Sequence, residues 1–409
     1  MRNAFVVAAL STAVLANGTA AAQAETARTE TARTGTAQAG SARAGTAQTG
    51  TVQTEALRAG TAHAGTARAG TAPAWTARDA AKPALPEPTG DRPVGTTTLH
   101  LVDASRPDPW NPDAGERELL VSLWYPATKP GGRRAPYMTK EESAAVLKGF
   151  DVPPDALVRT RTHARQTPPP KGRRMPLVLM SPGFTFPKAT LTSLAEDLAA
   201  RGYLVAAVEH TYESVATTFP DGRTTTCLAC VRGQDGAKVA GVRVADLRFV
   251  LDELIGRGLA DRARIVGVGH SMGGNSAVQS LLADSRVKAA VNLDGTFHPV
   301  VAELDRPVMM VGTTDHTPEG RDTTWKQSWA NLKGWKRWIT VKGTDHAAFV
   351  DYAVLRPQLG LPGSAIEGER ALKITRAYVA AFVDRQLKGK DGPLLDGPSQ
   401  AYPEVRFWK

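Results

Sequence analysis

Residues 266–274 read VGVGHSMGG, and this stretch decides how the rest of the chain is interpreted. Strand-forming residues lead into Ser271, and Gly269 and Gly273 stand two positions before and after it. The residues that follow, NSAVQSLLADS, have the apolar spacing of a helix. A serine at a sharp turn from strand to helix, with glycines where a Cβ would crowd the neighbouring chain, is a nucleophile elbow. The stretch therefore predicts Ser271 as a nucleophile exposed at the end of a strand.

Strands and helices alternate through the chain from residue 175 onward. Apolar runs predict strands at residues 175–183, 203–210, 263–271, 287–295, 306–315 and 337–346. Amphipathic spacing predicts helices at residues 191–202, 238–258, 275–285 and 369–389. This alternation indicates an α/β fold with a mostly parallel central sheet and helices on both faces. Two stretches of alternating polarity, 96–106 and 117–127, predict an antiparallel pair at an edge of that sheet.

His346 is the candidate general base, because a serine nucleophile needs a group that takes its proton. It follows the last strand predicted before the final helix, which is where the chain order serine, acid, histidine places the base. We interpret His298 and His316 as ordinary polar loop residues and His270 as a packing residue beside the nucleophile. His210 ends a predicted strand, and we expect it to shape the floor of the site.

The acid that orients the base has two candidates. Asp294 in NLDGTF ends one predicted strand, and Asp315 in GTTDHT ends the next. The carboxyl ends of both strands border the site. Either carboxylate could fix the imidazole tautomer and stabilise the imidazolium. Residue type and position leave both candidates open.

The oxyanion hole is expected from two backbone N–H groups. One belongs to Met272, which follows the nucleophile. The other lies in SPGFT after the strand at 175–183, where Gly183 permits close approach of the backbone, and we assign it to Phe184. The alternative is that SPG is only a turn.

The composition is that of a globular protein with an unusual N-terminal segment. Of the 409 residues 42% are hydrophobic, but apolar residues are sparse before about residue 95. The net charge is +10, yet the chain contains no long Lys/Arg block with interleaved aromatic residues, so we do not expect nucleic-acid binding. A basic surface allows transient contact with a membrane or lipid surface. We expect a monomer.

The N-terminus is interpreted as an export signal followed by a linker. Arg2, the apolar run AFVVAALSTAVLA and the A-x-A site before residue 25 predict a signal peptide over residues 1–24 and a secreted, extracellular protein. A retained membrane anchor is the weaker interpretation, because the run is too short to span a bilayer. Residues 25–90 form a degenerate Ala/Gly/Thr-rich repeat, which predicts a disordered linker. The catalytic domain is expected over residues 91–409.

Cys227 and Cys230 are the only cysteines, in TTTCLAC. An exported protein favours a disulfide between them. A zinc site would need two further ligands, of which His210 is the nearest candidate. A redox motif would stand at the start of a helix after a strand, whereas this pair lies in a Gly- and Thr-rich stretch.

These motifs together resemble a known family. Across about residues 95–390 the chain is similar to α/β-hydrolases, and within them to the plasma-type platelet-activating factor acetylhydrolases and related bacterial lipase-like proteins. The matching stretches are LLVSLWYPA, PLVLMSPGF, GYLVAAVEHTYES, VGVGHSMGGNSA, AAVNLDGTF and GTDHAAFVD. The resemblance implies that the acid is Asp294, in the LDG turn. Bacterial cutinases and polyester hydrolases share GHSMGG but carry the acid one strand later, at Asp315 here. The chain departs from them around NLDGTF and AVEHTYES, so Asp294 is favoured.

The resemblance implies a serine hydrolase that cleaves carboxylic esters, either short-chain esters or phospholipid acyl esters, through an acyl-enzyme. We expect that it needs no metal or organic cofactor, and that its partner is a small-molecule or lipid ester. Loops at residues 130–170 and 212–237 are expected to shape the acyl pocket. The alternatives are a cutinase or polyester hydrolase, a peptidase, and a non-catalytic surface-binding module. The intact serine, acid, histidine and oxyanion loop argue against the last of these.

Overall fold

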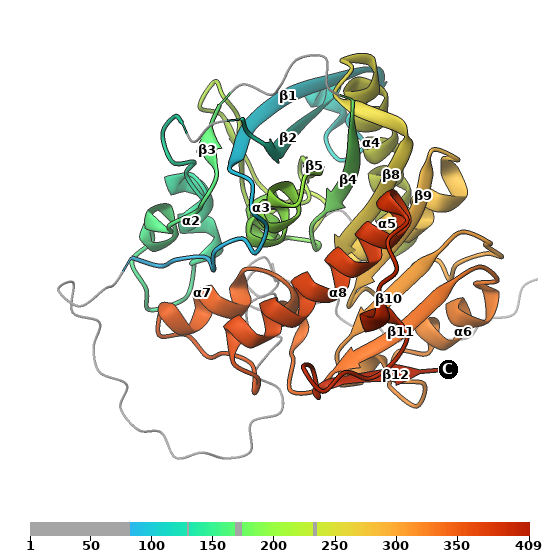
Figure 1. Ribbon diagram of the computed structural model, residues 1–409. Helices are drawn as coiled ribbons and strands as arrows, with labels where there is room; N and C mark the ends of the chain where they lie inside the picture. Colours follow the sequence, from blue (N-terminus) through green and yellow to red (C-terminus); the bar gives the residue numbers. More distant parts are fainter. Residues whose placement is uncertain (1–81, 129–130, 168–173, 232–234) are drawn as a thin grey trace, which may run out of the picture. The chain divides into compact units, whose positions relative to one another are not determined.

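The computed structural model describes residues 82–128, 131–167, 174–231 and 235–409 (Figure 1). The expected signal peptide, and the expected linker as far as residue 81, lie outside the described residues. No helix in the described ranges is both long enough and apolar enough to cross a membrane.

The core of the described chain is one ten-stranded sheet in the order β12-β11-β10-β9-β8-β4-β5-β2-β1-β3. Its centre, from β5 to β11, is parallel, while β2 pairs with β5 and β12 with β11 in antiparallel fashion. The strands are β1 Val94–Pro107, β2 Glu116–Pro126, β3 Arg165–Gln166, β4 Met175–Ser181, β5 Leu204–His210, β8 Ala260–His270, β9 Val287–Leu293, β10 Val308–Gly312, β11 Lys336–Val341 and β12 Val405–Trp408. A separate hairpin joins β6 Thr217–Thr218 to β7 Thr224–Thr225.

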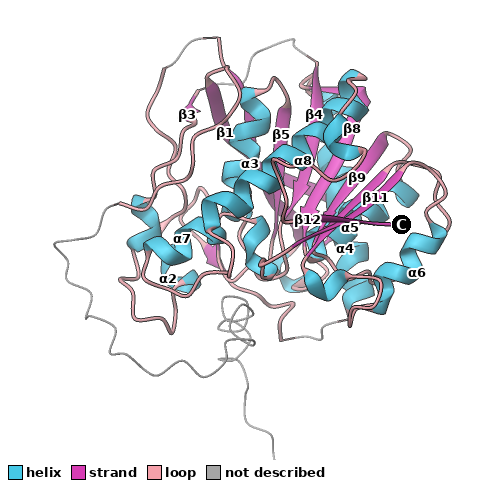
Figure 2. Ribbon diagram, turned by 60° about the horizontal axis from the view of Figure 1, so that its bottom comes forward, coloured by secondary structure: helices cyan, strands magenta, loops and turns pink. Residues whose placement is uncertain are grey.

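Helices cover both faces of this sheet (Figures 1 and 2). They are α2 Lys140–Val146, α3 Thr192–Ala200, α4 Gly236–Gly256, α5 Met272–Ala283, α6 Thr323–Asn331, α7 Tyr352–Gln358 and α8 Gly368–Lys388. Side chains alternate along a strand, so Val178 and Met180 of β4 pack in one core with α3, α7 and α8. Leu177 and Leu179 face the other core, with α4, α5 and α6.

The α/β fold predicted from sequence is therefore confirmed. The front pair of strands, the six strands from residue 175 onward and the four long helices all form where they were expected. The structure adds β12 at one edge of the sheet, together with α6 and α7, for which the sequence analysis made no prediction.

The described chain packs onto the domain from before residue 91, the expected start of that domain. Leu85 is buried in the core that contains α8. Arg376 of α8 donates to the carbonyl oxygens of Pro86 and Glu87 at 3.0 and 2.9 Å. The end of the segment assigned to the linker is thus held by an apolar anchor and by backbone hydrogen bonds.

Candidate active site

Ser271 lies at the turn between β8 and α5, at the carboxyl edge of the sheet. Its backbone has φ 55° and ψ −127°, a left-handed conformation that non-glycine residues rarely adopt. A Cβ on Gly269 would lie 2.1 Å from the carbonyl oxygen of Gly273, and one on Gly273 would lie 2.0 Å from that of Ser181. Both glycines are required because the turn is this tight. Strain of this kind is typical of functional sites.

The structure brings Asp294 and His346 together. Asp294 follows β9 and also has a left-handed backbone, with φ 58°. His346 Nδ1 lies 2.7 Å from Asp294 Oδ2. Both residues line a cavity of about 390 Å³ together with Ser271, and Phe184, Met272, Thr296, His298 and His316 are among its other lining residues.

Asp315, the alternative acid, lies elsewhere. Its side chain is 59% exposed and pairs with Arg321 at 2.9 Å, on the surface of the protein. It does not line the cavity that holds Ser271. Of the two carboxylates, the geometry places only Asp294 beside His346.

Asp294 is ionised in spite of its burial. Burial in a low-dielectric surrounding raises the pKa of a carboxyl group, but the charge of His316 and hydrogen bonds from His316 and His346 outweigh burial. The pKa of Asp294 therefore lies well below its usual range. The Thr313 N–H also donates to Oδ1, at 2.7 Å.

His270 packs against the candidate base, as expected of a packing residue. Its ring lies 4.6 Å from that of His346 and 5.4 Å from that of Phe186. Its Nε2–H donates to the His346 carbonyl oxygen at 2.7 Å. Burial, followed by the charge of His346, lowers the pKa of His270 to about 3, so the ring stays neutral.

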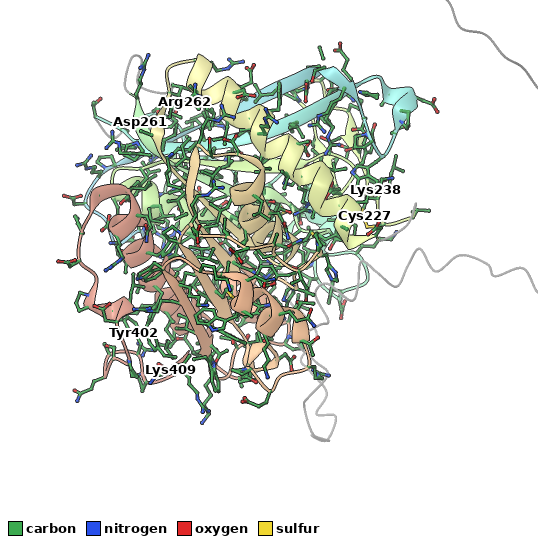
Figure 3. The ribbon with its side chains drawn as sticks, turned by 90° about the vertical axis from the view of Figure 1, so that its right-hand side faces the viewer. Cys227, Lys238, Asp261, Arg262, Tyr402 and Lys409 are labelled. Atoms are coloured by element: carbon green, nitrogen blue, oxygen red, sulfur yellow. A yellow bond between two sulfur atoms is a disulfide. The ribbon has the colours of Figure 1, made fainter. Side chains whose placement is uncertain are left out.

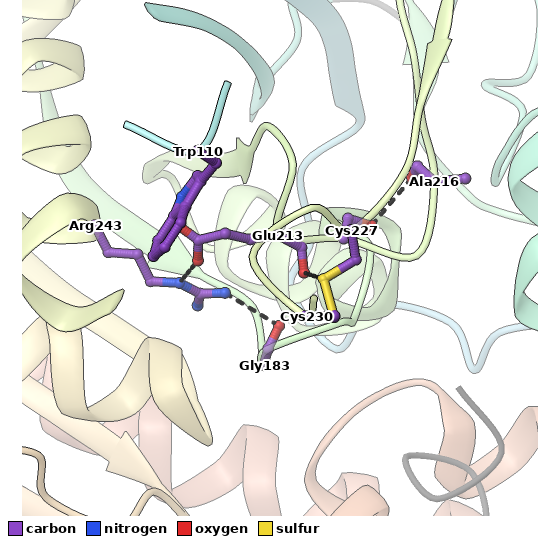
Figure 4. Close-up of a disulfide and its surroundings, with 8 residues drawn as sticks. Trp110, Gly183, Glu213, Ala216, Cys227, Cys230 and Arg243 are labelled. Atoms are coloured by element: carbon purple, nitrogen blue, oxygen red, sulfur yellow. Dashed lines mark hydrogen bonds and ion pairs between the residues drawn. A yellow bond between two sulfur atoms is a disulfide. The ribbon is translucent and has the colours of Figure 1, made fainter. Parts of the chain in front are cut away.

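Arg243 of α4 contacts the backbone of the loop that carries Phe184 (Figure 4). The guanidinium donates to the carbonyl oxygens of Pro182 at 2.5 Å and Gly183 at 3.5 Å. Its Nε pairs with Glu213 at 2.6 Å, and both side chains are buried. The C=O and N–H of a trans peptide point in opposite directions. The carbonyl of Gly183 faces Arg243, so the N–H of Phe184 points away from Arg243.

The expected disulfide is present between Cys227 and Cys230. The pair packs with Trp110, Val239, Phe184 and other residues in a small apolar cluster. Cys227 and Lys238 lie near the N-terminal end of α4, whereas Asp261 and Arg262 lie at the start of β8 (Figure 3). Within the described ranges, no group of three or more His, Cys, Asp or Glu side chains is arranged to hold a metal ion.

His210, expected at the floor of the site, lies inside a buried polar network. Its Nε2 contacts Ser181 Oγ at 2.9 Å and its Nδ1 contacts Asp246 at 2.8 Å. Asp246 is in turn paired with Arg106 and Arg117. Ser181, His210 and Asp246 are each at most 1% exposed. None of them lines the cavity of Ser271.

The sequence interpretation missed several residues of the site. His316, taken for an ordinary loop residue, contacts Asp294 Oδ1 through Nδ1 at 2.7 Å. Arg243 and Glu213 were not singled out. No motif marks these residues, because their roles depend on contacts between segments far apart in the chain.

Comparisons with known proteins agree with this fold. The family described as "Platelet-activating factor acetylhydrolase, isoform II" matches residues 156–227 and 228–392. A protein of Arthroderma benhamiae described as "Probable 1-alkyl-2-acetylglycerophosphocholine esterase" is 27% identical, over 79% of this chain and 93% of its own length. "Platelet-activating factor acetylhydrolase" of Cavia porcellus is 24% identical, over 53% of this chain and 58% of its own length.

A solved structure is also similar. "Ferulic acid esterase from Streptomyces cinnamoneus" has a TM-score of 0.73 and 44% identity, and the match covers 80% of this chain and 100% of that one. Fold and comparisons together define the protein as an α/β-hydrolase that cleaves carboxylic esters. The chain belongs to the platelet-activating factor acetylhydrolase, isoform II, family.

Proposed function

We propose that the protein hydrolyses esters in two acyl-transfer steps, with Ser271 as nucleophile, His346 as general base and Asp294 as the acid that orients it. The observation that carries this proposal is the 2.7 Å contact between His346 Nδ1 and Asp294 Oδ2, beside a cavity that Ser271 lines. Asp294 engages Nδ1–H, so Nε2 is the ring nitrogen left to take the serine proton.

In the first step, Ser271 Oγ attacks the ester carbonyl carbon while His346 takes the hydroxyl proton. The tetrahedral intermediate collapses, the alcohol leaves with the proton from His346, and the acyl group stays on Ser271 as an ester. In the second step His346 takes a proton from water, which attacks the acyl-enzyme. The acid leaves and Ser271 recovers its proton.

The developing oxyanion is held by the backbone N–H groups of Phe184 and Met272. Both residues line the cavity. The contacts of Arg243 with the carbonyl oxygens of residues 182 and 183 support this assignment, since they fix the peptide whose N–H is used. Donors fixed in advance contribute most, because they need no rearrangement when charge develops.

Catalytic roles are tested by substitution in the full chain, with p-nitrophenyl acetate as substrate. Ser271→Ala should abolish turnover and fluorophosphonate labelling, and Asp294→Asn should lower kcat about 10⁴-fold. The matched control, Asp315→Asn, should keep kcat within about twofold because that side chain is at the surface. Loss of turnover in Asp315→Asn with retention in Asp294→Asn would exchange the two roles.

For the substrate, we propose short acyl esters, including acetyl esters of phospholipids, as named for the relatives in the family. A second candidate, esters of hydroxycinnamic acids, is favoured by the 44% identity to a ferulic acid esterase. Comparing kcat/KM for p-nitrophenyl acetate, p-nitrophenyl palmitate and ethyl ferulate separates them. A preference for acetate supports the first, a preference for ferulate supports the second, and rapid turnover of palmitate would favour a lipase or polyester hydrolase.

We also propose that the protein is secreted, with residues 1–24 as the signal peptide and the repeat that follows as a linker to the catalytic domain. The A-x-A site before residue 25 supports this. Mass spectrometry of protein recovered from culture medium should find Glu25 as the first residue. An N-terminus that retains residues 1–24 would contradict cleavage.

A further inference from the structure

A second histidine lies on the far side of the candidate triad acid. His316 ends a short 3₁₀ helix, Thr314–His316, after β10. Its Nδ1 lies 2.7 Å from Asp294 Oδ1 and its Nε2 lies 3.0 Å from Asp322 Oδ2. His346 occupies the other carboxylate oxygen, Oδ2. The order of contacts is thus His346, Asp294, His316, Asp322.

The contacts of His316 define its protonation. An ionised carboxylate can only accept hydrogen bonds, so a ring with a carboxylate at each nitrogen must carry a proton on both. Burial opposes that charge, but the charges and hydrogen bonds of Asp294 and Asp322 outweigh it and raise the pKa of His316 to about 9. His316 is an imidazolium at neutral pH.

The ring of His316 is held firmly in place. It stacks on Trp325 of α6 with centroids 4.3 Å apart and an interplanar angle of 24°. The indole N–H of Trp338 in β11 donates to its carbonyl oxygen at 2.7 Å. Asp322 is fixed in turn, because it accepts from the N–H and hydroxyl of Thr324 at the start of α6. The cation therefore has one defined position relative to Asp294.

We propose that His316 is a positioning residue of the esterase, an imidazolium held by Asp322 that keeps Asp294 ionised and turns its second oxygen toward His346. This inference rests on the triad proposed above. His316 and the Thr313 N–H occupy Oδ1, which leaves Oδ2 for His346. The positive charge also offsets part of the negative charge of Asp294. Without it, the buried carboxylate of Asp294 has no cation at Oδ1.

Four titratable groups among the described residues determine the charge around Asp294 and His346. Asp294, after β9, contacts the ring of His346 directly. His270, at the end of β8, packs against that ring and is neutral. His316 and Asp322 lie behind Asp294 and carry opposite charges. Removal of the His316 cation leaves the carboxylates of Asp294 and Asp322 without a cation between them.

The test uses full-length protein and p-nitrophenyl acetate across pH 5 to 9. His316→Asn keeps an N–H donor near Asp294 but removes the charge. We expect kcat to fall about 10- to 100-fold, with KM changed less, since one charged hydrogen bond is lost. The acidic limb of the pH profile should move to higher pH.

A double substitution separates positioning from mere folding. In the Asp294→Asn background, His316→Asn should cost less than about threefold more activity, because the group through which His316 acts is already gone. Thermal unfolding verifies that each variant is folded. As a readout independent of turnover, ¹H–¹⁵N NMR of the wild-type protein at pH 7.5 should show both ring nitrogens of His316 protonated.

The outcomes distinguish this inference from the proposed function. Unchanged kcat and pH profile in folded His316→Asn, with Ser271→Ala and His346→Ala inactive, would overturn the role of His316 and leave the triad standing. A neutral His316 ring at pH 7.5 would overturn it too. Full activity of Ser271→Ala or His346→Ala would instead overturn the triad itself.

Discussion

Replacement of Arg243 by methionine tests how strongly the conformation of the loop that carries Phe184 depends on the buried side chain that contacts it. Arg243 is 1% exposed, pairs with Glu213 at 2.6 Å and donates to the carbonyl oxygens of Pro182 and Gly183. Methionine fills most of the volume but offers no donor. The carboxylate of Glu213 is then left buried without its cation. The carbonyl oxygen of Pro182 loses the Arg243 donor, and that of Gly183 keeps only the Phe186 N–H, at 3.1 Å.

The expected loss of stability follows from the broken ion pair. Breaking a buried ion pair by removing one partner destabilises a protein by about 3–5 kcal/mol. At roughly 2–4 °C per kcal/mol for a domain of this size, the Tm of Arg243→Met should fall by roughly 6–20 °C. If the N–H of Phe184 loses its direction, kcat should fall about 10²-fold or more, the usual cost of one oxyanion donor.

The assay is thermal unfolding together with hydrolysis of p-nitrophenyl acetate at a temperature where the variant is folded. The matched control is Arg243→Met combined with Glu213→Gln, which has no uncompensated buried charge. It should recover part of the lost stability but not the lost kcat, because an uncharged amide in place of the Glu213 carboxylate cannot direct the peptide between residues 183 and 184. Arg243→Met with an unchanged Tm and wild-type kcat would refute the reasoning.

Two further predictions concern stability. Replacing Cys227 and Cys230 by serine should lower the free energy of unfolding by about 2 kcal/mol, since the bond closes a loop of only four residues, and equal urea midpoints for variant and wild type would contradict this. Burial raises the pKa of Asp351 to about 7, so the folded state holds a proton that the unfolded chain releases near pH 4. The stability contributed by this carboxyl is therefore fully present below about pH 4, is lost as pH rises to 7, and amounts to roughly 4 kcal/mol at most. Asp351→Asn should remove this loss of stability with rising pH. In urea unfolding, the stability of the variant relative to wild type should therefore be higher at pH 8 than at pH 4. A difference that is the same at both pH values would contradict the role of Asp351.

The fold could be predicted from the sequence because its signals are local. A buried parallel strand shows as an apolar run, and an amphipathic helix shows as a 3.6-residue period, so β4, β5, β8 to β11 and the four long helices were found. The strand β12 was not, because VRFW is short and forms a strand only by pairing with the edge of β11. Leu85 was assigned to a linker because it lies in the proline-rich stretch AKPALPEPTGDRP, and its anchoring depends on α8, almost 300 positions away.

The same limit applies to the site. Ser271 could be predicted because glycine spacing and the strand-to-helix turn lie in one stretch of chain. The choice between Asp294 and Asp315 could not be made from the residues alone, because it depends on which strand end faces His346; the family resemblance was needed to favour Asp294. His316 was taken for an ordinary loop residue because nothing around TDHT shows that its ring reaches a carboxylate on the neighbouring strand.

The buried network of Ser181, His210 and Asp246 has a consequence for how serine hydrolases are recognised. Its serine, imidazole and carboxylate are joined in the same order, and through the same ring nitrogens, as a catalytic triad. A search of structures for that hydrogen-bond pattern alone would return this cluster as a hit. Yet no ester can reach Ser181, and Arg243 also donates to its hydroxyl at 3.3 Å. The protein thus contains a candidate catalytic site at Ser271 and a buried network at Ser181 with the same hydrogen-bond pattern. Solvent access to the serine hydroxyl distinguishes the two.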